Sequence, residues 1–325
     1  MTSSFASDPI LVEVVRSGVV ESVHHGRVAI TNADGSLAAS LGAQFAPMYP
    51  RSSSKPLQAV GMVRAGLELH DELLALVASS HSGEEFHQSG VRTILAGSGL
   101  DEHALQTPPD WPSDEQAREQ AIRAGHQRTG LAMNCSGKHA GMLATSVIND
   151  WPTDTYRDPD HPTQLAILTS LDDLAGEQAS QLAVDGCGAP LFAISLYGLA
   201  RAYGRLAAAV SGPERRVGDA IRAHPQWTSG TRRDELALLR AVPGLVGKAG
   251  AEAVYAVGLP DGRGVALKIS DGSDRARAVA MAGVLQRLGY EHETLAAQAS
   301  GPVLGHGGRV GEIRPAAESL ARLGS

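Results

Sequence analysis

The sequence contains few cysteines and few aromatic residues, and it has no long hydrophobic run. Two cysteines in 325 residues, Cys135 and Cys187, exclude a framework of several disulfides. No segment approaches the roughly 18 uninterrupted apolar residues that identify a transmembrane helix. The chain also has no excess of positive charge, because its net charge is −7, so it lacks the basic character typical of nucleic-acid binding. We therefore expect no nucleic-acid partner and no membrane partner.

The first residues carry no basic segment followed by an apolar run, so we expect no signal peptide. This predicts a cytoplasmic, reducing location, in which the two cysteines are free thiols, a redox pair or metal ligands. The hydrophobic content of 43% and the length indicate a globular chain with a sizeable core.

Strand patterns lie near both ends of the chain, and helical patterns fill the middle. Apolar, β-branched runs around an Asp-Gly turn predict one hairpin within residues 10–46 and another within 253–271. Between them, helices are predicted over 56–66, 84–97, 161–184 and 191–208. We expect an α/β fold, with an antiparallel sheet and flanking helices from roughly 8–50 and 245–325, and a mainly helical lobe from 51–244.

The stretch Arg51–Gln58 contains a Ser-x-x-Lys pair, Ser52 and Lys55. In a helical segment these positions share a face, so the lysine amine can take the proton of the serine hydroxyl. Ser-x-x-Lys is the nucleophile element of penicillin-recognising hydrolases. The alternative is a simple helix start, with a serine cap and Pro56 in the first turn. Moreover, Lys55 precedes a proline, and this disfavours helical geometry at that residue.

A polar run, Ser79–Glu84, follows an apolar segment and precedes the helix predicted over 84–97. Loops at the ends of core elements often carry catalytic groups, which makes Ser80 and His81 candidates. Ser82 and Glu85 have the spacing of a capping box, and we expect Ser82 to cap the following helix.

The stretch Asn134–Leu143 places Cys135, Lys138 and His139 at positions i, i+3 and i+4, on one face of a helix. A nearby lysine lowers the pKa of a thiol. The alternative is a small-residue helix start with a buried cysteine. A turn at Asp185-Gly-Cys187 carries the second thiol and an acid.

Lys268 lies in the middle of a predicted strand, between apolar neighbours. A lysine in this position extends to solvent from an edge strand, or it is held in a cleft beside a functional group. Lys248 is a second lysine flanked by small residues and glycine.

Together, five stretches resemble the L-asparaginase II family, of the inducible, thermolabile rhizobial type. They are Arg51–Pro56, Ser79–Glu84, Asn134–Leu143, Asp185–Cys187 and Val265–Gly272. The resemblance extends over nearly the whole chain, and Asn134–Leu143 is its most specific part. It implies one asparaginase domain over residues 1–325 with a serine-β-lactamase-like fold. It also implies hydrolysis of L-asparagine to L-aspartate and ammonia, usually by a homodimer.

The resemblance also implies roles for individual residues. It implies two catalytic Ser/Lys pairs, a zinc site near the substrate, and residues that contact the substrate. The catalytic pairs are Ser52 with Lys55 and Ser80 with Lys268; the zinc ligands are Cys135, Lys138 and Cys187; the substrate contacts are Arg51, His81 and Asp185. Two thiolates suit zinc, whereas a lysine must lose its proton before it can bind a metal.

Two other functions fit the same residues. The protein is alternatively a glutaminase or another Ser-x-x-Lys hydrolase, although the expected absence of a signal peptide disfavours a cell-wall substrate. It is alternatively a non-catalytic zinc-binding or sensor protein that uses Cys135 and Cys187 and whose serines are structural.

Overall fold

The computed structural model describes residues 8–324, which divide into two compact units. The first, here called the sheet unit, contains residues 8–53, 194–208 and 237–324. The second, the helical unit, contains residues 54–193 and 209–236. Residues 194–208, which the sequence analysis assigned to the helical lobe, belong to the sheet unit.

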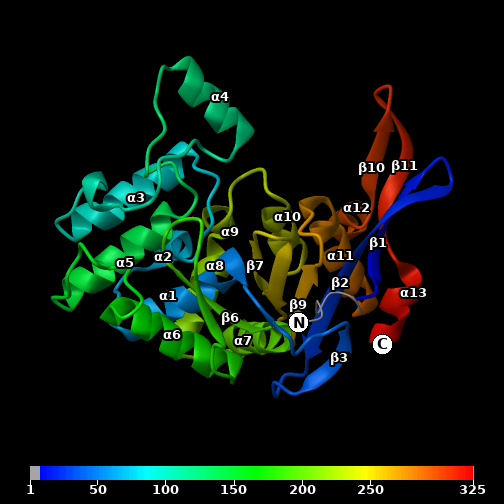
Figure 1. Ribbon diagram of the computed structural model, residues 1–325, viewed down its shortest axis with the longest axis horizontal. Helices are drawn as coiled ribbons and strands as arrows, with labels where there is room; N and C mark the ends of the chain where they lie inside the picture. Colours follow the sequence, from blue (N-terminus) through cyan, green and yellow to red (C-terminus); the bar gives the residue numbers. More distant parts are fainter. Residues whose placement is uncertain (1–7, 325) are drawn as a thin grey trace. The chain divides into compact units, whose positions relative to one another are not determined.

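The sheet unit is built on an antiparallel sheet with strand order β10-β11-β1-β2-β9-β8-β7, and β3 pairs with β2 (Figure 1). The strands are β1 (Ile10–Arg16), β2 (Val19–Thr31), β3 (Leu37–Leu41), β7 (Val246–Gly250), β8 (Val254–Gly258), β9 (Gly264–Ile269), β10 (Gly301–Gly305) and β11 (Gly308–Pro315). The three strands β7, β8 and β9 are buried along their whole length, so their apolar runs form the core of this unit.

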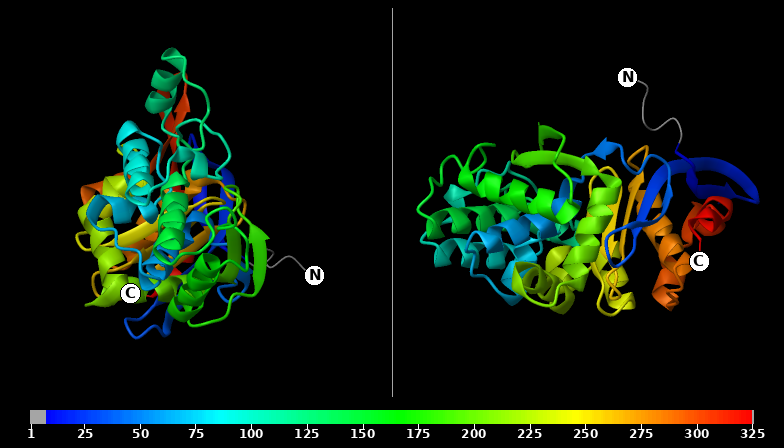
Figure 2. Two further views of the ribbon diagram at one scale, coloured as in Figure 1. Left: turned by 90° about the vertical axis from the view of Figure 1, so that its left-hand side faces the viewer. Right: turned by 90° about the horizontal axis from the view of Figure 1, so that it is seen from below.

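Helices cover both faces of this sheet. Helix α7 (Leu196–Ala208) packs on β2, β8 and β9, and α11 (Asp274–Arg287) packs on β1, β9 and β11 (Figure 2). The remaining elements of this part of the chain are β4 (Pro47–Met48), η1 (Arg51–Ser54), α10 (Asp234–Ala241), α12 (Glu293–Gln298), α13 (Ala317–Leu320) and η3 (Ala321–Leu323).

The helical unit is organised around α1 (Lys55–Arg64), α2 (Asp71–Val77) and α5 (Ser136–Ile148), which contact one another. Two glycines of α5 allow this close packing. A Cβ at Gly137 would lie 2.5 Å from the Leu76 carbonyl oxygen, and one at Gly141 would lie 2.6 Å from a Val77 methyl group. The other elements are α3 (Glu85–Gly97), η2 (Glu102–Ala104), α4 (Glu115–Arg123), α6 (Pro162–Ala175), β5 (Gln181–Val184), β6 (Pro190–Ser195), α8 (Gly212–Ala223) and α9 (Pro225–Thr228).

The structure confirms the α/β class, the antiparallel sheet and both predicted hairpins. Two predicted helices are partly wrong. The helix predicted over 191–208 begins as strand β6, because a fully buried apolar run has no periodicity that separates strand from helix. The helix predicted over 161–184 ends at Gly176, whose φ of 67° stops α6, and β5 follows.

His24 and His25 both lie within β2, and His24 is buried between Asp271 and Arg275. No helix in residues 8–324 is both long and apolar enough to cross a membrane.

Gly250 of β7 supports the turn that carries Ser52, and its replacement tests this packing. A Cβ at Gly250 would lie 2.7 Å from the Pro50 carbonyl oxygen, 3.0 Å from the Ser53 nitrogen and 3.2 Å from the Ser52 nitrogen. We expect Gly250→Ala to destabilise the protein by about 1–3 kcal/mol and to lower its activity, because backbone atoms must move. Thermal unfolding and activity assays measure both effects. Gly97→Ala is the control, since no atom lies within 4 Å of the added methyl group; equal stability of the two variants would contradict the packing argument.

Candidate active site

The predicted nucleophile, Ser52, lies in η1, which leads directly into α1. Ser53 Oγ donates to the Pro50 carbonyl over 2.6 Å, and Gln58 Nε2 donates to Ser54 Oγ over 2.9 Å. Ser52 is half-buried, and within residues 8–324 its hydroxyl has no hydrogen-bond partner. Of the three consecutive serines, Ser52 is therefore the one whose hydroxyl is available for chemistry.

The η1 turn is held in place from within the sheet unit. Arg51 begins it with φ of 52°, a conformation uncommon outside glycine. Tyr203 of α7 donates from its hydroxyl to the Ser53 carbonyl over 2.6 Å, and Gly250 of β7 packs against the turn. These contacts maintain the strained backbone at Arg51. Contact of the half-buried Arg51 side chain with substrate stays a prediction.

Lys55 is the first residue of α1 and is 1% exposed. It is helical despite the following proline, because η1 continues into α1 and Pro56 occupies a first-turn position that needs no N–H. Residues three apart lie along one line in a 3-10 turn, so the local backbone suits a Ser-x-x-Lys pair. The two units divide between Ser53 and Ser54, and the approach of the Lys55 amine to the Ser52 hydroxyl stays a prediction.

Lys55 belongs to a buried cluster of sulfur atoms and lysines. Its Nζ donates to Cys135 Sγ over 3.0 Å, and Lys138 Nζ donates to Cys187 Sγ over 3.3 Å. Asp185 Oδ2 lies 3.8 Å from the Cys187 sulfur. We call these five residues the sulfur–lysine cluster. The structure therefore brings the predicted base of the first Ser/Lys pair against the predicted metal ligands, a contact that no sequence pattern predicted.

The two sulfurs of this cluster differ in protonation. The hydrogen bond with Cys135 lowers the pKa of Cys187 far below its usual value, and Lys138 and His139 act in the same direction against the effect of burial. The same hydrogen bond, together with burial, raises the pKa of Cys135. Burial acts to lower the pKa of Lys138, but the two sulfurs and Asp185 outweigh it and raise that pKa. The cluster thus holds a thiolate at Cys187, a thiol at Cys135 and an ammonium at Lys138.

The distance between the Cys187 sulfur and the Lys138 nitrogen suits two ligands of one zinc ion. A sulfur and a nitrogen bound to one tetrahedral zinc lie about 3.5 Å apart, close to the 3.3 Å between Cys187 Sγ and Lys138 Nζ. Within residues 8–324, no group of three His, Cys, Asp or Glu side chains is placed to hold a metal. A zinc site here would therefore use two thiolates and the lysine amine, and Cys135 and Lys138 would each have to lose a proton.

Ser80 and His81 lie in the loop between α2 and α3, and both are buried. Ser136 Oγ donates its only proton to the Leu131 carbonyl, so the Ser136 oxygen accepts a hydrogen bond from His81 Nε2 over 2.9 Å. The other ring nitrogen, His81 Nδ1, accepts from the Gly83 nitrogen over 3.1 Å. Burial and nearby positive charges lower the pKa of His81 well below 6.5. The neutral ring anchors the loop that carries Ser80, and a contact of His81 with substrate stays a prediction.

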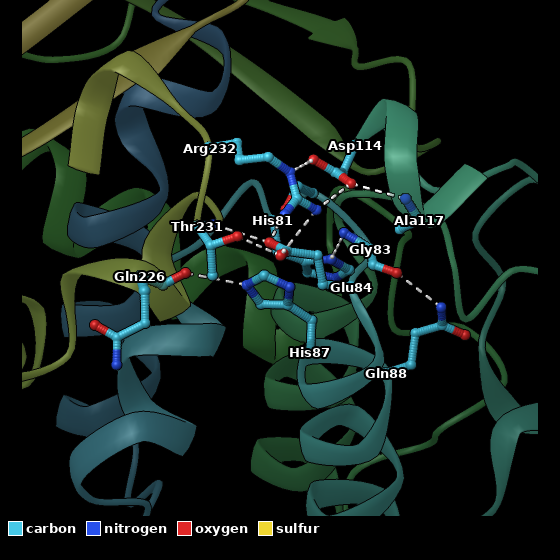
Figure 3. A network of polar contacts seen from close by, with 11 residues as sticks. His81, Gly83, Glu84, His87, Gln88, Asp114, Ala117, Gln226, Thr231 and Arg232 are labelled. Carbon is cyan, nitrogen blue, oxygen red and sulfur yellow. Dashed lines mark hydrogen bonds and ion pairs between the residues drawn. The ribbon is translucent and has the colours of Figure 1, made fainter. Parts of the chain in front are cut away.

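A polar network fixes the start of α3 (Figure 3). The Glu84 carboxylate accepts from Ser82 Oγ over 2.7 Å, from the Thr231 nitrogen over 2.9 Å and from Thr231 Oγ1 over 2.5 Å. Arg232 bridges Glu84 and Asp114, and the Asp114 nitrogen donates to the Ser82 carbonyl over 2.9 Å. Three segments that lie far apart in the sequence thus meet beside the Ser80 loop.

The prediction of a capping box from Ser82 and Glu85 is wrong, because this network forms in its place. Glu84 is the N-cap residue of α3, and Ser82 donates its proton to the Glu84 carboxylate. Burial acts to raise the pKa of Glu84, but hydrogen bonds from Thr231 and Ser82 outweigh it and lower that pKa. Sequence reasoning missed the network, because spacing along the chain contains no signal for a partner near residue 231.

Lys268 lies in β9, as predicted, within the sheet unit. Its Nζ donates to the carbonyls of Glu252 and Ile269 over 2.6 and 2.7 Å, and burial lowers its pKa. Ser80 belongs to the other unit, so the Ser80–Lys268 pair stays a prediction. Lys248, 1% exposed, is a second candidate, because it lies two residues before Gly250 on the strand that supports the Ser52 turn.

An α/β fold with a Ser-x-x-Lys element at the start of a buried helix is typical of Ser/Lys hydrolases. The chain belongs to the L-asparaginase II family, whose profile matches residues 12–315. This confirms the resemblance drawn from the five sequence stretches. A comparison with curated proteins found no match.

The solved structures that a comparison matched to this chain share little sequence with it. It is 13% identical to Mglu in its glutamate form, with a TM-score of 0.43, over 79% of this chain and 58% of Mglu. It is 14% identical to the probable glutaminase YbaS, with a TM-score of 0.40, over 84% of this chain and 84% of YbaS. It is 14% identical to a beta-lactamase (Mb2281c) from Mycobacterium bovis, with a TM-score of 0.42, over 77% of this chain and 88% of that protein. This chain spans less than two thirds of that Mglu chain.

The Glu84 network predicts a pH-dependent contribution to stability. A carboxylate with a lowered pKa stabilises the folded state above its usual value, 4.5 for Glu84, and loses this effect as the pH falls through the lowered pKa. We expect Glu84→Gln to cost about 2 kcal/mol at pH 7, because it removes charged hydrogen bonds, and progressively less below pH 4.5. Denaturant unfolding across this pH range measures the difference. Glu85→Gln is the control, because the Glu85 side chain is 84% exposed; a pH-independent cost of Glu84→Gln would contradict the assignment.

Proposed function

We propose that this protein hydrolyses L-asparagine to L-aspartate and ammonia. The match of the L-asparaginase II family over residues 12–315 carries the proposal. The local structure supports it, since Ser52 has an unengaged hydroxyl and Lys55 is a buried amine three residues later. Amide hydrolysis requires a nucleophile, a base, an acid for the leaving amine and donors for the oxyanion.

In the first step, Ser52 Oγ attacks the side-chain carboxamide carbon of the substrate, and the hydroxyl proton passes to the neutral amine of Lys55. The tetrahedral intermediate then breaks its C–N bond. The lysine returns the proton to the departing nitrogen, which leaves as ammonia, and an ester links Ser52 to the aspartyl group. Backbone N–H groups of the η1 turn are candidates for oxyanion donors, because a turn presents successive amides to one side.

In the second step, water attacks the ester carbon and L-aspartate leaves, while Ser52 regains its proton. A base must activate this water, and the second pair, Ser80 and Lys268, is assigned that role in the proposal. The lowered pKa of Lys268 supports a base function, although its ammonium donates to two carbonyls. Lys248 is the competing candidate.

Charged groups recognise the substrate in this proposal. L-Asparagine carries an α-carboxylate and an α-ammonium group. The guanidinium of Arg51 suits the carboxylate, and the carboxylate of Asp185 suits the ammonium. His81, neutral and buried, contributes by holding the loop that carries Ser80.

Zinc completes the proposal, held by Cys135, Lys138 and Cys187. A bound zinc ion would supply a Lewis-acidic centre and would fix these side chains. Cys135 would serve both as a ligand and as the acceptor of the Lys55 hydrogen bond, so the metal site and the base would share one sulfur. Homodimer formation and a cytoplasmic location remain predictions.

The alternative enzyme is a glutaminase, whose substrate is one methylene longer. A pocket discriminates such homologues by only about 1–3 kcal/mol, so asparagine and glutamine must be compared directly. The alternative without catalysis is a zinc-binding protein in which the same cysteines hold the metal and Ser52 is structural.

Removal of the nucleophile tests the reaction. We expect the wild type to release ammonia from L-asparagine faster than from L-glutamine, and Ser52→Ala to lower kcat at least about 10³-fold with the fold kept. Ser53→Ala is the control, since its hydroxyl already bonds to Pro50; it keeps activity and loses about 1 kcal/mol of stability. An active Ser52→Ala together with an inactive Ser80→Ala would identify Ser80 as the nucleophile. No turnover of either amide would reject the proposal.

Metal analysis tests the zinc ligands. We expect about one zinc per chain in the wild type, and loss of zinc in Cys135→Ser, Cys187→Ser and Lys138→Met, because each removes one donor of a three-ligand site. Elemental analysis after gel filtration measures the content, with circular dichroism to verify folding. Lys268→Met is the matched control and should retain zinc. Full occupancy in Cys135→Ser refutes the ligand assignment.

A further inference from the structure

His139 is buried beside the sulfur–lysine cluster, and one of its ring nitrogens has no hydrogen-bond partner. It follows Lys138 in α5 and is fully buried. Its Nδ1 lies 2.7 Å from Tyr156 Oη, whereas Nε2 is buried and has no hydrogen-bond partner in the described part of the chain. A buried polar atom without a partner is uncommon and requires a physical explanation.

Tyr156 determines which nitrogen of His139 carries the proton. The Gln106 backbone N–H donates to Tyr156 Oη over 3.0 Å, so this oxygen already accepts one hydrogen bond. The single phenolic proton is then directed to His139 Nδ1, the other polar atom within reach. Burial raises the pKa of Tyr156 to about 12, which keeps this proton in place. His139 therefore carries its own proton on Nε2.

The Cys187 side chain acts on the His139 ring, and the preceding residue, Lys138, contacts the Cys187 sulfur over 3.3 Å. Burial lowers the pKa of His139 to about 4, while an interaction with Cys187 opposes that shift, as expected for a thiolate beside the ring. The Tyr156 segment also contacts the turn that carries Cys187. A Cβ at Gly188 would lie 2.3 Å from Arg157 Nη1, and Arg157 Nε donates to Gln106 Oε1 over 2.7 Å.

We propose that Tyr156 and His139 form a hydrogen-bond relay that directs the His139 Nε2–H at the Cys187 sulfur and positions this sulfur to bind the metal. His139 is thus a positioning residue and not a metal ligand. This inference rests on the zinc site of the proposed function.

The relay offers the negative charge of the Cys187 thiolate a hydrogen-bond donor besides Lys138. In the structure, the ammonium of Lys138 compensates the Cys187 thiolate over 3.3 Å. A lysine that bound a metal would be neutral and would no longer compensate the thiolate. The neutral His139 ring can donate to the sulfur in both states, because its donation does not depend on a titration step. Donors of this kind to metal ligands typically contribute 10–100-fold to metal affinity.

The first test measures the tautomer in the metal-free protein. Two-bond ¹H–¹⁵N spectra of protein labelled with ¹⁵N-histidine distinguish a proton on Nε2 from one on Nδ1. We expect Nε2–H for His139 in the wild type and a mixture of tautomers in Tyr156→Phe, which lacks the phenolic proton. An Nδ1–H tautomer in the wild type overturns the relay, whether or not the protein binds zinc.

The second test measures zinc affinity by chelator competition in two His139 variants. Asparagine keeps a polar group near Tyr156 but does not reach the sulfur, whereas the longer glutamine returns a donor near the Nε2 position. We expect His139→Asn to bind zinc about 10–100-fold more weakly and His139→Gln to recover most of this loss. His161→Asn, a change at another buried histidine that caps α6, should leave zinc affinity unchanged.

The outcomes separate this inference from the zinc proposal. Equal affinity of wild type, His139→Asn and His139→Gln overturns the relay. Complete loss of zinc in both His139 variants, with folded protein, also overturns it, because His139 would then be a ligand. If the wild type binds no zinc, the zinc proposal fails, and the histidine spectra still decide which ring nitrogen of His139 carries the proton.

Discussion

The contact between the Lys55 amine and the Cys135 sulfur is the interaction on which the candidate site depends. It lies in the interior, where a polar group without a partner costs free energy. Lys138 and Cys187 form a second lysine–sulfur contact in the same cluster, and Cys187 carries most of the negative charge. The lysine proposed as the base and the proposed metal ligands thus form one electrostatic unit, and a change in protonation at either sulfur acts on the lysine beside it.

Small residues make this contact possible. Gly137 and Gly141 let α5 approach α2 closely, and α1 contacts both helices. Larger residues at these positions would separate the helices by the width of a side chain and remove the amine from the sulfur. In the sheet unit, Gly250 has the corresponding role for the turn that carries Ser52. The glycines of this sequence therefore serve the site through packing, as well as through turns.

Sequence patterns predicted the local structure well where periodicity or turn chemistry was clear. Both hairpins, the antiparallel sheet and the helix after Ser52 were expected and found. Prediction failed where burial on all sides removed periodicity, as in β6, and where a distant partner replaced a local one. Ser82 illustrates the second case. Its hydroxyl donates a hydrogen bond to the Glu84 carboxylate, which Thr231 and Arg232 hold in place, and the predicted capping box does not form.

The sequence by itself determined the family, the Ser-x-x-Lys spacing and the chemical types of the donors, because these depend on residue identity and short-range geometry. Only the tertiary structure decided which groups meet. It joined Lys55 to Cys135, bonded both ring nitrogens of His81 to the protein and placed Tyr156 against His139. Such contacts connect residues far apart along the chain. They follow from how helices and loops pack, and no local pattern records that packing.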